Sequence, residues 1–158
     1  MRMQIRLQGF TQNKKKWLLA VLLLGFVCRL FACFWGKPYC LHPDEGCIVN
    51  NAIDMIKRHS YEVNYYNRPD HFEIKCCAVL FQVVSYARYH VGAEVAFAEH
   101  SFVFYLVARM FTAFFGACMI PLAYQVLELL KKGAGLAGAA WVAFCPFFIQ
   151  HSAYATPD

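Results

Sequence analysis

The first group of side chains that could do chemistry is the run His42-Pro43-Asp44-Glu45. A carboxylate can take the proton from a hydroxyl nucleophile as a new bond forms, which makes Asp44 and Glu45 candidate catalytic residues. His42 adds a second group that handles protons or binds phosphate, and it is a candidate substrate-binding residue. The simpler interpretation is a helix start, because proline suits the first helical position and acids in the first turn gain about 0.3–1 kcal/mol from the helix dipole. The sequence leaves both interpretations open.

The second group lies at the end of the sequence, at His151, Tyr154 and Asp158. A histidine and an aspartate recur there directly after an apolar run, so these three side chains are candidate substrate-binding residues. The alternative is a polar cap on a membrane span, in which an interfacial tyrosine has no special role.

Two arginines, Arg29 and Arg109, interrupt apolar runs and are further candidates for substrate binding. A charged side chain at mid-membrane costs about 2.5–3.5 kcal/mol, less where it can reach toward the interface. Each arginine is about seven residues from the outer end of its run, or roughly 10 Å at 1.5 Å per residue. The matching depth predicts one cationic patch that binds a lipid phosphate. Pairing of each arginine with an acid inside a helix bundle is an equal alternative.

The elements that must position these side chains are predicted membrane helices. The sequence is 59% hydrophobic and 16% charged, and the apolar residues are clustered, which is typical of membrane segments. The first run, residues 17–36, is long enough to cross a bilayer core of roughly 30 Å. The tail before it, residues 1–16, contains no acid and carries Arg2, Arg6, Lys14, Lys15 and Lys16. A basic tail in this place predicts a cytoplasmic anchor rather than a nucleic-acid-binding segment.

Residues 37–100 form the predicted outer loop, with two amphipathic helices on the membrane surface. The first helix begins at Pro43 and has an apolar face made of Ile48, Val49, Ala52, Ile53 and Ile56. The second covers His71–Tyr89, with Ile74, Cys77, Ala78, Phe81 and Val84 on one side. The uncharged centre of this second helix, residues 76–87, is too short to span a bilayer.

Two further spans are predicted at residues 101–130 and 133–150, separated by Lys131-Lys132. The third span is rich in glycine and alanine, which lets helices approach closely, and Pro146 is expected to bend or end it. The positive-inside rule then places the N-terminus and Lys131-Lys132 in the cytoplasm and both acidic segments on the opposite face. We therefore expect an all-α, multi-pass integral membrane protein with three transmembrane helices, in the plasma membrane if it is bacterial.

The eight cysteines do not predict a disulfide scaffold, because half of them lie in apolar runs and no C-x-x-C or zinc-binding spacing occurs. A Cys40–Cys47 bridge across the first acidic segment is an alternative that spacing does not decide. The run Leu30-Phe31-Ala32-Cys33 is similar to a lipoprotein cleavage site. The long apolar stretch and the arginine just before this run favour a retained helix over cleavage.

The order of these features resembles the GT-C fold glycosyltransferases that use polyprenyl-phosphate donors, such as the protein O-mannosyltransferases and the lipid A aminoarabinose transferases. The outer Asp-Glu pair, two amphipathic segments, an arginine-bearing second span and Tyr-Ala-Thr-Pro-Asp at residues 154–158 carry the resemblance, which covers residues 17–158. It implies inverting transfer of a sugar from the lipid-phosphate donor to a hydroxyl of a glycan, lipid or protein on the outer face. Asp44 would be the base with Glu45 beside it, and Asp158 would belong to the same site. No cofactor is implied, and a divalent cation is left open.

Enzymes of this type have many more spans than three. We therefore expect residues 17–158 to be the N-terminal part of a larger transferase domain, and we expect the isolated chain to be inactive. The alternatives are a non-enzymatic membrane protein, such as a transporter fragment, and a lipoprotein anchored through Cys33. A transporter favours acids or broken helices at mid-membrane, whereas the acids here lie outside the runs apart from Glu128.

Overall fold

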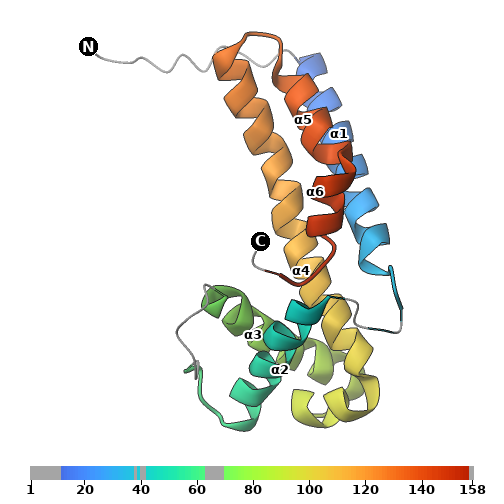
Figure 1. Ribbon diagram of the computed structural model, residues 1–158, viewed down its shortest axis with the longest axis vertical. Helices are drawn as coiled ribbons and strands as arrows, with labels where there is room; N and C mark the ends of the chain where they lie inside the picture. Colours follow the sequence, from blue (N-terminus) through green and yellow to red (C-terminus); the bar gives the residue numbers. More distant parts are fainter. Residues whose placement is uncertain (1–11, 38, 40–41, 63–69, 157–158) are drawn as a thin grey trace, which may run out of the picture.

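The computed structural model describes residues 12–37, 39, 42–62 and 70–156. The described chain is helical and contains no strand, which confirms the all-α class. The six helices are α1 (Gln12–Cys33), α2 (Pro43–Lys57), α3 (His71–Tyr89), α4 (Ala93–Leu130), α5 (Gly135–Phe144) and α6 (Pro146–His151). They form two packed regions along one long axis (Figure 1).

The first region is a bundle in which α1, α4 and α5 lie side by side, with α6 continuing the line of α5 (Figure 1). Its buried residues include Ile120 and Tyr124 of α4 and Ala139 and Ala143 of α5. Small residues permit this close packing, because a Cβ on Gly25 of α1 would lie 2.8 Å from the Cβ of Ala143. The glycine-rich third segment therefore packs as its composition indicates.

The second region is formed by α2, α3 and the first part of α4, which share a core of their own. The predicted apolar face of α2 is confirmed, because all five of its residues are buried: Ile48, Val49, Ala52, Ile53 and Ile56. The predicted bounds of α3 are those observed, and Ile74, Cys77, Ala78 and Phe81 are buried as expected. The two amphipathic helices therefore bury their apolar faces against each other and against α4.

The predicted second span, 101–130, lies within a longer helix. α4 starts eight residues earlier, and the non-helical backbone of His100 (φ −129°, ψ 39°) separates this first segment from the rest. Phe104 and Ala108 lie beyond His100 and still belong to the core shared with α2 and α3. From Met110 onward α4 exposes large apolar side chains instead, down to Leu130.

The predicted third span, 133–150, is not one continuous helix. It is divided into α5 and α6 at Cys145, whose backbone is extended (φ −64°, ψ 123°). The residue before a proline is driven out of the helical region by the proline ring, and Pro146 follows directly. The expectation that Pro146 bends or ends this helix is confirmed.

Two polar contacts connect α1 to α4, one near each end of α1. At one end Lys14 Nζ lies 3.1 Å from Glu128 Oε1. At the other end Arg109 Nη1 donates a hydrogen bond to the carbonyl oxygen of Cys33 at 3.0 Å. Residues 14 to 33 and residues 109 to 128 each cover nineteen steps, or about 28 Å of helix.

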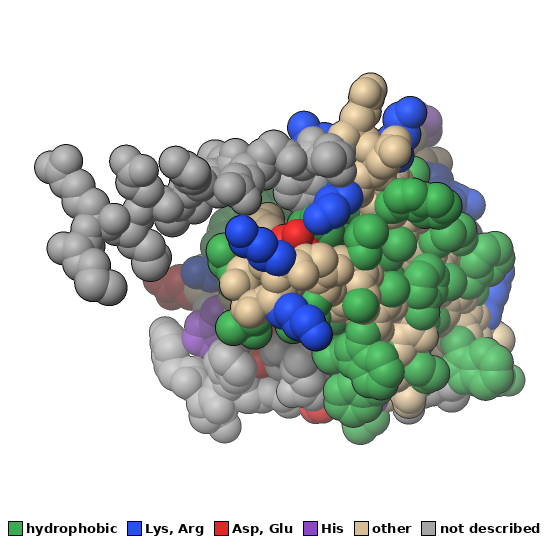
Figure 2. Space-filling view, turned by 90° about the horizontal axis from the view of Figure 1, so that it is seen from above, with side chains coloured by type: hydrophobic (Ala, Val, Ile, Leu, Met, Phe, Trp, Pro, Cys, Tyr) green, Lys and Arg blue, Asp and Glu red, His purple; other side chains and the backbone are tan. Residues whose placement is uncertain are grey.

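That length is close to the thickness of a bilayer core. By length and composition, both α1 and α4 are able to cross a membrane. The basic side chains Lys15, Lys16, Lys131 and Lys132 are exposed at one end of the bundle, whereas α2 and α3 lie at the other end. Figure 2 views the molecule from the basic end and shows Lys and Arg side chains over the helix ends, with hydrophobic side chains along the flank.

Candidate functional site

A buried ion pair lies at the end of the bundle where α2 begins. Arg109 of α4 holds Glu45 of α2 with two hydrogen bonds, Nε to Oε1 at 2.7 Å and Nη2 to Oε2 at 2.8 Å. Both side chains are completely buried. A bidentate pair fixes orientation as well as distance, so it sets how α2 docks on α4.

The same pair also forms hydrogen bonds with two further segments of the chain. Arg109 Nη1 donates to the carbonyl oxygens of Cys33 (3.0 Å) and Trp35 (3.1 Å), which lie at and just beyond the C-terminal end of α1. Glu45 Oε1 accepts a hydrogen bond from the backbone N–H of Ala155 at 3.1 Å. Four segments that are distant in the sequence therefore meet at one ion pair.

Asp44 lies beside this pair but faces outward. Its side chain is 35% exposed in the first turn of α2, where the helix dipole favours a negative charge. The backbone N–H of Asp44 donates to Nδ1 of His42 at 3.3 Å, so His42 caps the helix. The same Nδ1 is 3.9 Å from Asp44 Oδ2, which is too long for a hydrogen bond.

The ring of His42 lies 5.2 Å from the ring of Tyr154, which brings the two predicted motifs into contact. We call the five residues His42, Asp44, Glu45, Arg109 and Tyr154 the acidic cluster. Within it, the side chain of Asp44 is partly exposed to solvent, whereas that of Glu45 is completely buried. Asp158, the remaining acid predicted for this site, lies outside the described residues, as does Cys40 of the alternative Cys40–Cys47 bridge.

Arg29 has a different environment. Its Nη1 donates to the carbonyl oxygens of Gly25 (3.0 Å) and Ala143 (3.1 Å), and its Nη2 donates to that of Val142 at 2.8 Å. The carbonyl of Val142 would normally accept from the N–H of residue 146, which is a proline and has none. Arg29 thus satisfies backbone groups that the break between α5 and α6 leaves open.

Arg29 and Arg109, which were predicted to form one cationic patch, are both completely buried, and the hydrogen bonds described above connect them to different residues. Arg109 pairs with an acid, as the alternative interpretation expected. Arg29 pairs with carbonyls and with the hydroxyl of Ser152, to which its Nε donates at 3.3 Å. The role of either arginine in binding a donor phosphate stays a prediction.

A groove runs along α4 between the start of α3 and α6, and we call it the α4 groove. It encloses about 570 Å³. Its polar lining consists of Glu73, Thr112, His151, Ser152 and Thr156, with Gly116 in the floor. Its apolar lining consists of Phe72, Phe111, Phe115, Cys118, Met119, Leu122 and Phe148.

Glu73 was not predicted as a site residue, and it is the carboxyl group of this groove. Its Oε1 lies 3.0 Å from the hydroxyl of Thr112. Burial raises the pKa of Glu73, the hydrogen bond with Thr112 lowers it in part, and the negative charge of Asp70 raises it further. In the sequence Glu73 looks like an ordinary first-turn acid of α3, and only the packing of α3 on α4 reveals its position.

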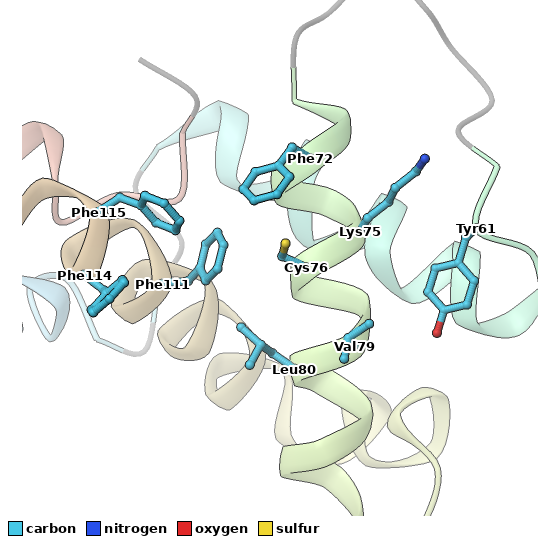
Figure 3. Close-up of a pocket in the computed structure, with 9 residues that line it drawn as sticks. All are labelled: Tyr61, Phe72, Lys75, Cys76, Val79, Leu80, Phe111, Phe114 and Phe115. Atoms are coloured by element: carbon cyan, nitrogen blue, oxygen red, sulfur yellow. The ribbon is translucent and has the colours of Figure 1, made fainter. Parts of the chain in front are cut away.

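A second, apolar groove adjoins the first and shares Phe72, Phe111 and Phe115 with it. It lies between α3 and α4, and Figure 3 shows Lys75 and Tyr61 at its side away from α4. None of the predicted site residues lines it. Among the described residues, no group of three or more His, Cys, Asp or Glu side chains is placed to hold a metal ion.

Comparison with known proteins gives no match to any family model, curated protein or solved structure.

Proposed function

We propose that this chain is part of a membrane glycosyltransferase that transfers a sugar from a polyprenyl-phosphate donor to an acceptor hydroxyl on the non-cytoplasmic face. The observation that supports it best is the division of roles within the Asp-Glu pair. Glu45 is buried against Arg109, whereas Asp44, the next residue, stays accessible at the start of α2. An accessible carboxylate is what general-base catalysis needs.

The membrane arrangement in this proposal has three crossings, made by α1, α4 and the α5–α6 pair. The matched nineteen-residue separations and the exposed lysines at one end support it, because basic residues favour the cytoplasmic side. The acidic cluster then lies at the outer surface, where α2 and α3 cover the ends of the bundle.

In the proposed reaction, Asp44 accepts the proton of the acceptor hydroxyl while the hydroxyl oxygen attacks the anomeric carbon of the sugar. The bond between that carbon and the lipid phosphate breaks, and the phosphate leaves with the electron pair. Glu45 is a positioning residue that acts through Arg109 and the docking of α2. His42 and Tyr154 flank Asp44 and are placed to contact the sugar or the acceptor.

The test is the variant Asp44→Asn, in native membranes and in the length that the gene encodes. It should lower sugar transfer from a radiolabelled polyprenyl-phosphate donor by about two orders of magnitude or more, with donor binding retained. Asp54→Asn is the matched control, because Asp54 lies on the same helix and pairs with the exposed Arg58. A normal transfer rate with Asp44→Asn would remove Asp44 as the base and leave the helix-start interpretation sufficient.

A transporter fragment is the second candidate, and the break between α5 and α6 is the observation that favours it. Broken helices in transporters offer open carbonyl groups to ions, whereas here Arg29 occupies the carbonyls of Val142 and Ala143. Solute flux in proteoliposomes without any sugar transfer would favour this candidate over the transferase.

A further inference from the structure

The α4 groove is polar at one end and apolar at the other. Glu73 and Thr112 lie at the level where α3 meets α4, and Leu122 lies ten residues further along α4, or about 15 Å. Met119 is 55% exposed and Leu122 is 50% exposed, so this part of the groove is open at the flank of the bundle. A molecule that fits the groove is therefore amphipathic, with its polar group near Thr112.

A positive charge lies directly behind the floor of the polar end. Gly116 and Ser152 form this floor, and a Cβ on Gly116 would lie 3.3 Å from Nε of Arg29. The same Cβ would collide with the side chain of Ser152, so the glycine is what allows Ser152 and Arg29 to approach α4 this closely.

The charge of Arg29 has no carboxylate partner in the described part of the chain, because its hydrogen bonds go to carbonyl oxygens and to the Ser152 hydroxyl. A buried cation that is balanced by dipoles alone attracts an anion at the nearest accessible surface. The groove floor formed by Gly116 and Ser152 is a surface beside Arg29 from which an anion can approach this charge.

The hydroxyls of Thr112, Ser152 and Thr156 line this part of the groove. Those of Thr112 and Ser152 already donate to Glu73 and to the carbonyl oxygen of Phe148, so they reach an anion only by rotating away from these partners. Glu73 is the opposing charge in the groove. Burial raises the pKa of this carboxyl, which weakens its repulsion of an anion.

We propose that the α4 groove binds a lipid with a phosphate head, the phosphate lying over Gly116 and Ser152 and the hydrocarbon chain lying against Met119 and Leu122. This rests on the proposed function for the placement of α4 in a membrane, and it deepens that function by naming where the phosphate of the lipid is held. The charge of Arg29 selects the phosphate, and the open apolar end selects the chain.

The test uses the full chain in dodecyl maltoside at pH 8, with dodecyl phosphate as the probe and thermal unfolding as the readout. Dodecyl phosphate should raise the midpoint in a saturable manner, because a ligand that binds the folded state stabilises it. Dodecyl glucoside, with the same chain and no charge, and inorganic phosphate, with the charge and no chain, should each have little effect.

Two variants give opposite expected results. Met119→Trp fills the apolar end and should weaken dodecyl phosphate binding at least tenfold. Val126→Trp is its matched control, because Val126 lies two turns further along α4, has the same 55% exposure and does not line the groove. Glu73→Gln removes the opposing charge and should strengthen binding of dodecyl phosphate several-fold without changing the response to dodecyl glucoside.

An equal response to dodecyl glucoside would overturn recognition of the charge. A full response to inorganic phosphate alone would show an anion site without a lipid, and unchanged affinity in Met119→Trp would remove the groove as the place of the chain. None of these measurements needs turnover. A failure to bind dodecyl phosphate in the groove can therefore be distinguished from a failure of the transferase function, which the Asp44→Asn assay tests.

Discussion

The replacement Glu45→Gln is predicted to destabilise the folded chain far more than its small change in shape suggests. Glutamine keeps the size of the side chain, so no cavity forms, but it removes the negative charge that Glu45 holds against the buried guanidinium of Arg109. One of the two bonds to Arg109 is also lost, because the amide nitrogen of glutamine is a donor that faces another donor. Breaking a buried ion pair from one side costs about 3–5 kcal/mol.

The measurement is the free energy of unfolding in detergent micelles, from denaturant titrations. Asp54→Asn is the control, because Asp54 and Arg58 are 2.8 Å apart and exposed, whereas the Glu45 and Arg109 pair is 2.7 Å apart and buried. An exposed helical pair contributes about 0.3–0.5 kcal/mol, so Glu45→Gln should lower the free energy of unfolding nearly ten times as much as Asp54→Asn does.

The double variant Glu45→Gln/Arg109→Met should recover most of the lost stability, because it removes the uncompensated charge together with its partner. An equal loss of unfolding free energy in Glu45→Gln and Asp54→Asn would show that the buried charge of Arg109 contributes nothing extra. A double variant less stable than Glu45→Gln alone would place the energy in packing rather than in charge.

Three further predictions concern separate parts of the molecule. The pKa of Glu73 is raised in the folded chain, so the stability that Glu73 contributes is fully present below about pH 4.5 and is lost as the pH rises through the native pKa. In unfolding titrations at increasing pH, Glu73→Gln should therefore become more stable relative to the wild type. A difference in stability that stays constant across pH would contradict this. In intact cells, with a cysteine-free background, a single cysteine at Ser60 should react with a membrane-impermeant thiol reagent and one at Lys132 should not; labelling at position 132 would reject the three-span arrangement. Arg29→Leu leaves two buried carbonyls unpaired and should cost about 2–6 kcal/mol, and Pro146→Ala should restore part of this in the double variant by supplying an N–H, whereas no rescue would place the role of Arg29 elsewhere.

The sequence by itself predicted the local elements well where one apolar face repeats at helical spacing. The bounds of α3 and the buried face of α2 follow from side-chain period alone, because each turn of a helix returns the same face to the core. The break at Pro146 also follows from local chemistry, since a proline constrains the residue before it and removes an N–H. Sequence reasoning therefore identified the segments and the candidate side chains.

Tertiary structure decided which of those side chains meet. Arg29 and Arg109 look alike in the sequence, with similar distances from the ends of apolar runs, yet one binds carbonyls of α5 and the other binds Glu45. The difference depends on the rotation and level at which each helix packs on its neighbours, and periodicity within one helix contains no information on either. Glu73 was not predicted for the same reason, because its position in the α4 groove depends on how α3 crosses α4.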